Sequence, residues 1–231
     1  MNWLSFKGHR TDEAPGIIVA KMPHPKKAQM RYTEYQVRGR NGALHSFEGY
    51  DTFDITCRLM LVDSNVENRQ WINNWASGTG KLITSDDPIK AYNASVLREI
   101  NWMRDEGYKG YWDTAEITFT CQPIIVEAID REVTFTQSGS INNIGTIESS
   151  PLIKVNGSGN CSFAVGDYSI SISGVTSGVP VYIDCENGYV YTASGAMSMT
   201  GEFPVLGLGT TTITVGSGVS SLVITPRWGW V

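Results

Sequence analysis

The stretch Phe53-Asp54-Ile55-Thr56-Cys57-Arg58-Leu59-Met60-Leu61 alternates apolar and polar residues with a period of two, interrupted at Met60. Because successive side chains of a strand point to opposite faces, this pattern predicts a half-buried β-strand. The apolar side carries Phe53, Ile55, Cys57, Leu59 and Leu61. A second alternating run at residues 115–121, followed by Gln122-Pro123, predicts another strand that ends at the proline. A sheet with one buried face is therefore expected in this part of the chain.

A hairpin is predicted just before the first of these strands. Asn41-Gly42 is a dipeptide that tolerates positive φ at both central positions of a type I′ turn. Residues 35–40 run into this turn, and residues 43–47 can return beside them.

A helix is expected from about residue 65 to residue 77. Ser64 can accept a hydrogen bond from the backbone N–H of Glu67, whose side chain reaches back to form a capping box. Gly78 supplies a left-handed stop. The helix carries two tryptophans one turn apart, Trp71 and Trp75, which predicts an aromatic stripe that packs onto the sheet.

Charge is spread unevenly along the 231 residues. Residues 1–140 hold 16 Lys/Arg and 18 Asp/Glu, which leaves 2 and 5 for residues 141–231. Fourteen of the 24 glycines fall between Gly139 and Gly218, among many Ser, Thr, Val and Ile. Short β-branched runs between glycine turns are typical of an all-β sandwich. We therefore expect two domains, residues 1–138 and 139–231, joined by a polar linker at residues 137–143.

Seven strands are predicted in the second domain, which makes it a small β-sandwich. Asn187-Gly188 is a second type I′ signal and predicts a hairpin between two of them. The predicted strands cover residues 152–155, 162–165, 169–172, 179–185, 189–192, 211–215 and 221–224.

The overall composition excludes several classes of protein. A hydrophobic fraction of 41% with 18% charged residues is that of an ordinary globular protein. The net charge of -5 argues against nucleic acid as a specific ligand, because binding phosphates needs a basic surface. The N-terminus has no signal-peptide pattern, and no apolar run is long enough to span a membrane, so neither export nor membrane insertion is expected.

Four cysteines lie far apart and show no C-x-x-C spacing, so buried thiols are expected rather than a zinc or redox centre. They are Cys57, Cys121, Cys161 and Cys185.

No enzymatic motif stands out. The three histidines, His9, His24 and His45, lack the spacing of metal ligands. Serines 158 and 217 each lie directly between two glycines, which is common in loops and does not match a nucleophile elbow. The sequence therefore predicts no catalytic, cofactor-binding or metal-binding residues and no cofactor.

Two alternatives stay open. The second domain could hold a sugar through stacked aromatics such as Tyr182, Tyr189 or Tyr191, as a carbohydrate-binding module that aids attachment to a host surface. Asp184 and Glu186 would share a strand face, and such a pair of acids could serve a glycoside hydrolase. Both acids flank a tight turn, where polar residues are expected in any case.

Several segments, taken in order along nearly the whole chain, together resemble the distal tail protein family of siphophages and related prophages. The ending Trp228-Gly229-Trp230-Val231 departs from the family, because it interrupts what is often a tryptophan pair. The segments that carry the resemblance are residues 39–42, residues 53–61, the predicted helix with Trp71 and Trp75, and residues 78–82, 84–88, 117–123, 143–151, 183–186, 201–204 and 224–228.

The resemblance implies a structural protein of the virion tail tip that is not an enzyme. It implies an N-terminal domain, sandwich-like or split-barrel-like with one α-helix, that forms a hexameric ring, and a C-terminal galectin-like or carbohydrate-module-like sandwich. The implied partners are copies of the chain, the tail tube protein, the tape-measure protein and the tail-associated adhesin or lysin. Assembly would take place in the cytoplasm of the bacterial host, and the sandwich allows a weak contact with cell-wall glycan.

Overall fold

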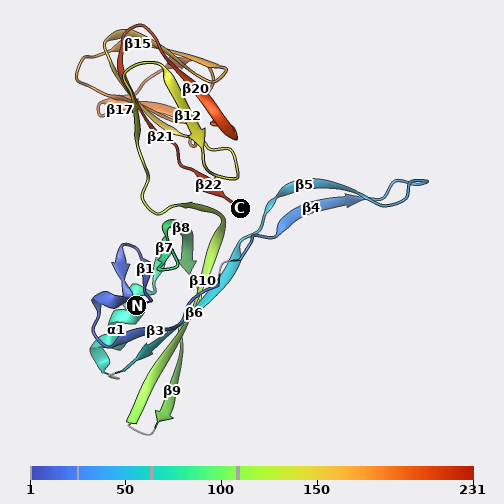
Figure 1. Cartoon of the computed structure of the whole chain (residues 1–231), viewed down its shortest axis with the longest axis vertical. Helices are drawn as coiled ribbons and strands as arrows, with labels where there is room; N and C mark the ends of the chain where they lie inside the picture. Colours follow the sequence, from blue (N-terminus) through green and yellow to red (C-terminus); the bar gives the residue numbers. More distant parts are fainter. Residues whose placement is uncertain (1, 25, 63–64, 108–109) are drawn as a thin grey trace. The chain divides into compact units, whose positions relative to one another are not determined.

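The computed structural model describes residues 2–24, 26–62, 65–107 and 110–231. The chain forms two compact units, Met1–Ala128 with Val231 and Ile129–Trp230. Figure 1 shows that both consist mainly of strands, which confirms the mainly β fold expected from the sequence. The domains expected at residues 1–138 and 139–231 remain a prediction.

The first unit is built on one antiparallel sheet, in which the strands run in the order β2-β1-β7-β8-β10-β6-β3. β9 (Asn101–Gly107) pairs with the early part of β10. A short 3-10 helix at Thr11–Glu13 lies between β2 and β3. The strands of the sheet are β1 (Leu4–Phe6), β2 (His9–Arg10), β3 (Ile17–Lys21), β6 (Phe53–Leu61), β7 (Gly78–Thr84), β8 (Asp87–Val96) and β10 (Gly110–Glu127).

The strand predicted at Phe53–Leu61 is confirmed as β6. Four of the five residues expected on its apolar face are buried, and Phe53 is half-buried. The opposite face carries polar pairs with the neighbouring strand β10, such as Arg58 with Glu116 at 3.0 Å. Alternation at period two thus predicted the whole strand, because one face of this sheet is buried and the other faces solvent.

The strand predicted at residues 115–121 lies within β10, but its predicted end is wrong. β10 continues to Glu127 through Gln122-Pro123, and its register with β8 shifts between Cys121 and Ile125. A bulge tolerates a proline, because the missing N–H falls where the ladder of hydrogen bonds is already interrupted.

The helix α1 spans Val66–Trp75 and covers the buried face of the sheet. Its N-cap is Asn65, whose side chain accepts a hydrogen bond from the backbone N–H of Asn68 at 2.7 Å. The cap is thus an asparagine, and the predicted capping box rests on Ser64, which lies outside the described residues. The expected aromatic stripe is confirmed, since the rings of Trp71 and Trp75 stack with centroids 5.9 Å apart.

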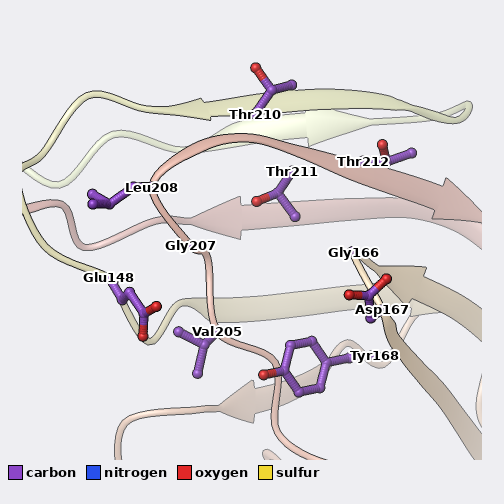
Figure 2. Close-up of a pocket in the computed structure, with 10 residues that line it drawn as sticks. All are labelled: Glu148, Gly166, Asp167, Tyr168, Val205, Gly207, Leu208, Thr210, Thr211 and Thr212. Atoms are coloured by element: carbon purple, nitrogen blue, oxygen red, sulfur yellow. The ribbon is translucent and has the colours of Figure 1, made fainter.

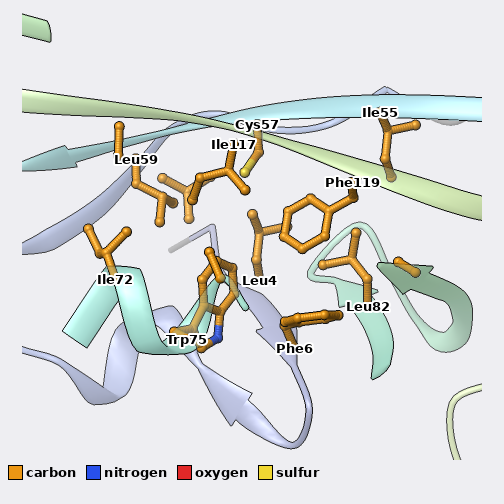
Figure 3. Close-up of a cluster of buried hydrophobic side chains, with 14 of the residues drawn as sticks. Leu4, Phe6, Ile55, Cys57, Leu59, Ile72, Trp75, Leu82, Ile117 and Phe119 are labelled. Carbon is orange, nitrogen blue, oxygen red and sulfur yellow. The ribbon is translucent and has the colours of Figure 1, made fainter. Parts of the chain in front are cut away.

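The core of the first unit lies between α1 and the sheet (Figure 3). Side chains of β6 and β10 point toward the helix, and Phe6 and Phe119 meet with ring centroids 5.1 Å apart. Trp75 packs 6.0 Å from each of these rings, and its Nε1 donates a hydrogen bond to the carbonyl of His9 at 2.8 Å. These contacts fix the helix on the sheet.

The second unit is a sandwich of two antiparallel sheets. One has the order β11-β21-β13-β16-β17-β18 and the other β12-β20-β14-β15-β19, and apolar side chains from both form its core. β22 (Gly229–Trp230) follows near the end of the chain. The strands of the sandwich are β11 (Val133–Phe135), β12 (Gly139–Asn143), β13 (Leu152–Gly157), β14 (Gly159–Val165), β15 (Tyr168–Val175), β16 (Val181–Asp184), β17 (Tyr189–Thr192), β18 (Gly195–Ala196), β19 (Met199–Thr200), β20 (Gly209–Val215) and β21 (Val219–Thr225).

All seven predicted strands of this part are present. The predicted linker at residues 137–143 is wrong over most of its length, because residues 139–143 form β12 and pair with β20. Ile141 and Asn143 are buried there, which shows that alternate residues of β12 face the core. The polar composition of this segment did not indicate a strand. The hairpin predicted at Asn187-Gly188 joins β16 to β17, but its connection covers residues 185–188 and is longer than a type I′ turn.

Among the described residues, no helix has both the length and the apolar character needed to cross a membrane.

Candidate functional site

The most unusual surface of the first unit is a two-stranded arm, formed by β4 (Met30–Tyr35) and β5 (Leu44–Tyr50). These strands form a sheet of their own, and in Figure 1 they extend away from β6 and β10. The hairpin predicted here is confirmed, but its turn is not at Asn41-Gly42 alone. Tyr35 pairs with Leu44, so residues 36–43 form a longer loop, in which Gly39 and Gly42 adopt positive φ.

Both faces of the arm carry exposed apolar side chains. Tyr32 pairs with Phe47 on one face, and Tyr35 pairs with Leu44 on the other. These four side chains are 41% to 55% exposed, although each is large and mostly apolar. An isolated two-stranded hairpin is marginally stable in water. Exposed apolar side chains gathered on one element are typical of a surface that contacts a partner.

The arm has the chemistry of a protein interface. Aromatic residues are enriched at such interfaces, where their rings add contact area at a low entropy cost. Polar contacts accompany them, with Arg31 Nε 3.4 Å from Asp51 and His45 Nε2 3.8 Å from Glu34. Both long edges of the arm also offer unpaired backbone groups, to which a strand from another chain can add.

Sequence reasoning found the hairpin but not its exposed apolar surface. The signal was present in Met30-Arg31-Tyr32-Thr33-Glu34-Tyr35, where apolar residues fall at positions 30, 32 and 35 and so fit no single face. Residues 30 and 32 share one face of this strand and residue 35 lies on the other, because successive side chains of a strand point to opposite faces. A strand that is apolar on both sides and lies outside any sheet core is a sign of a partner.

The two acids considered for a hydrolase are held by an arginine. Arg227 Nη1 lies 2.8 Å from Asp184 and 3.0 Å from Glu186. The hydrogen bond from Arg227, helped by bonds from Asn187, lowers the pKa of Asp184 to about 2. A general acid needs a raised pKa, so this geometry gives Asp184 the opposite property and favours a structural role for the pair.

The three tyrosines considered for sugar binding do lie together, on the outer face of β16 and β17. Tyr182 and Tyr191 stack with ring centroids 5.2 Å apart at 17°, and Tyr189 lies 5.2 Å from Tyr191. Lys154 Nζ lies 6.0 Å from the centroid of the Tyr182 ring. The ring faces are therefore largely occupied by one another, which leaves edges and hydroxyl groups for any partner.

The four cysteines are free thiols. Cys57, Cys121 and Cys161 are buried and Cys185 is half-buried, in line with the expected role as small core residues. Burial raises the pKa of Cys57 to about 12, which keeps this thiol protonated and unreactive. In the part of the chain that the structure describes, no group of three or more His, Cys, Asp and Glu residues is placed to hold a metal ion.

No protein-family profile matches the chain, and no curated protein matches it in sequence. Solved structures do match. The SPP1 Dit protein, described as a paradigm of the hub adsorption apparatus in phages that infect Gram-positive bacteria, is similar over 99% of both chains, with a TM-score of 0.73 and 13% identity. A chain of the phage P2 baseplate in its activated, Ca-containing conformation is similar over 98% of both chains, with a TM-score of 0.51 and 9% identity. At these identities the similarity is one of fold, and at that level it confirms the resemblance seen in the sequence segments.

Proposed function

We propose that this chain is a distal tail protein, the structural hub of the tail tip of a long-tailed bacteriophage or prophage. The observation that carries the proposal is a fold shared over its whole length with a phage hub protein. The order of sequence segments described above supports the same family independently of the fold. A protein of this kind acts through the shape of its surfaces and transforms no substrate.

The hub would be a homo-oligomeric ring, a hexamer by analogy with the family. The arm supplies a physical reason for association, because a neighbouring copy would bury its apolar side chains and pair with its two free strand edges. In a closed ring every subunit offers the same pair of complementary surfaces, so each arm can pack on the next copy and no edge stays free.

The partners follow from the place of such a ring in a tail. One face would stack on the tail tube protein and the other would hold the tail-associated adhesin or lysin. The lumen would accommodate the tape-measure protein during assembly in the host cytoplasm. Residues 1–138 would form the ring, and residues 139–231 would form the outer sandwich.

Two matched double variants test the role of the arm. Tyr32→Ser with Phe47→Ser removes the aromatic pair from one face of the arm and is expected to weaken self-association at least about tenfold, because buried aromatic side chains dominate interface energies. Tyr189→Ser with Ile144→Ser is the control, since these two residues are each 49% exposed but lie in the second unit. Sedimentation velocity measures the association of each variant.

Circular dichroism should show the same strand content in both variants, because neither pair lies in a core. If both variants lose association equally, or if neither variant loses it, the arm is not part of the interface.

A further inference from the structure

Three Asn-Gly pairs occur in the sequence, at Asn41-Gly42, Asn156-Gly157 and Asn187-Gly188. This dipeptide is open to a spontaneous reaction, because glycine has no Cβ to shield its backbone nitrogen from the side-chain amide of the asparagine before it. The attack requires that the asparagine side chain can turn and that the glycine nitrogen can reach its Cγ atom. The fold therefore decides which of the three pairs can react.

The pair Asn187-Gly188 is held at both of its reacting groups. The backbone N–H of Gly188 donates to the carbonyl of Asp184 at 2.8 Å, and Nδ2 of Asn187 donates to the carboxylate of Asp184 at 2.9 Å. The backbone N–H of Asn187 also donates to this carboxylate, at 3.3 Å. Asp184 is itself fixed by Arg227 at 2.8 Å, so two hydrogen bonds to an anchored residue must break before the glycine nitrogen can attack.

The pair Asn156-Gly157 is held within the sandwich. Asn156 lies in β13 opposite Ser221 of β21, and its Nδ2 donates to Ser221 Oγ at 2.9 Å. The backbone of Gly157 packs closely against Gly218, since a Cβ on Gly157 would fall 2.3 Å from the carbonyl oxygen of Gly218. The neighbouring strand therefore fixes both the side chain of the asparagine and the backbone of the glycine.

The pair Asn41-Gly42 has none of these restraints. It lies in the loop of residues 36–43 at the tip of the arm (Figure 1), and both residues are exposed. Gly42 has a positive φ of 80°, and apart from its chain neighbours no atom lies within 4 Å of where its Cβ would be. Within the described part of the chain, neither the side chain of Asn41 nor the N–H of Gly42 forms a hydrogen bond. Both reacting groups are thus free to meet.

We propose that Asn41 is a site of spontaneous deamidation, and that the fold protects the other two Asn-Gly pairs. The nitrogen of Gly42, after losing its proton to hydroxide, forms a bond to Cγ of Asn41, and the Cγ–Nδ2 bond breaks as ammonia leaves with a proton from water. Water then opens the cyclic imide at either of its carbonyls, which gives aspartate or isoaspartate at position 41. Nothing is oxidised or reduced, and water is the only co-reactant.

The product changes the charge at the tip of the arm. Residues 36–43 contain Arg38 and Arg40 and no acidic residue, so their formal charge is +2, and one new carboxylate lowers it to +1. In isoaspartate the main chain also continues through the side chain, which lengthens the backbone of the loop. The modification goes beyond the proposed hub function and does not depend on it.

Peptide mapping by mass spectrometry tests the proposal on the full chain, kept at mildly alkaline pH and sampled over time. It detects the gain in mass when the NH₂ group of an asparagine side chain is replaced by OH. We expect conversion at Asn41 to be at least about tenfold faster than at Asn156 or Asn187, because the hydrogen bonds of those two residues must break before the attack. In urea that unfolds the chain, the three rates should agree within about threefold, because the fold then restrains none of the pairs.

Two matched variants test the protection of Asn187. Asp184→Ala removes the carboxylate that holds Asn187 and should speed conversion there while leaving the rate at Asn41 unchanged. Glu186→Ala removes a neighbouring exposed acid and should change neither rate. If Asp184→Ala does not fold, the comparison of the folded and the unfolded unaltered chain still decides the proposal.

The proposal is overturned if Asn41 converts no faster than Asn156 and Asn187 in the folded chain, or if Asn41 stays tenfold ahead of them in urea. It is also overturned if Glu186→Ala speeds conversion as much as Asp184→Ala does. The mass of the oligomer, measured on the same samples, reports on the hub function separately, so either idea can fail without the other.

Discussion

At the scale of single residues, the most strongly constrained charge in the second unit is Asp184. Its side chain is 7% exposed and accepts hydrogen bonds from Arg227 at 2.8 Å and from the side chain of Asn187 at 2.9 Å. The backbone N–H groups of Glu186 and Asn187 donate to it as well, at 3.2 and 3.3 Å. The carboxylate thus fixes the turn between β16 and β17 and holds Arg227, which adopts an unusual positive φ of 58°.

This cluster predicts an acid-sensitive contribution to stability. The pKa of Asp184 falls from 3.8 to about 2 on folding, so the ionised group stabilises the fold by about 2 kcal/mol above pH 4. That contribution is lost as the pH falls through 2. Asp184→Asn should therefore lower the free energy of unfolding by about 2 kcal/mol at pH 6, and by progressively less below pH 4. Urea unfolding at a series of pH values measures both quantities.

Glu186→Gln is the matched control, because Glu186 also pairs with Arg227 but its side chain is 65% exposed. An exposed ion pair contributes little, so this change should alter the free energy of unfolding by less than about 1 kcal/mol at any pH. A loss on Asp184→Asn that is the same at pH 2 and pH 6 would contradict the assigned role of the ion pair.

At the scale of elements, α1 depends on a single side-chain cap. Asn65→Ala removes the acceptor for the backbone N–H of Asn68 and should destabilise the first unit by about 1 kcal/mol. Asn74→Ala makes the same chemical change at an exposed position inside the helix, where alanine is the better helix former, and should stabilise the unit by up to about 0.5 kcal/mol. Thermal unfolding of the two variants measures both effects. If both substitutions shift the melting temperature in the same direction, Asn65 is not the cap.

The elements also show what the sequence could predict. β6 was predicted to the residue, because one of its faces is buried and the alternation is nearly complete. β12 was missed because its short apolar pattern, centred on Ile141, is surrounded by Ser, Gly and Asn that resemble a linker. The end of β10 was missed because Pro123 stops most strands, and a bulge is not visible from composition.

The same limit applies to the candidate sites. The three tyrosines of β16 and β17 were grouped correctly because they alternate along strands joined by one turn. The surface hollow lined by Glu148, Asp167 and Tyr168 (Figure 2) was not found, because its residues come from three segments far apart in the sequence. The apolar surface of the arm was missed because period-two reasoning looks for one buried face, whereas this element exposes both.

At the scale of the whole molecule, the two units have different chemical characters. The first unit contains most of the charge and the arm, whose large apolar side chains are exposed. The second is a sandwich with its own core. In the proposed function, the first unit would build the assembly and the second would form the outer sandwich.

The central claim is that copies of this chain close into a ring. Light scattering coupled to size-exclusion chromatography, with negative-stain imaging of the same fractions, tests it most directly. We expect a species of about six times the 25.4 kDa of the chain, seen as a closed annulus with a central opening. A protein that stays at 25.4 kDa over the whole concentration range, with no annular particles, would contradict it.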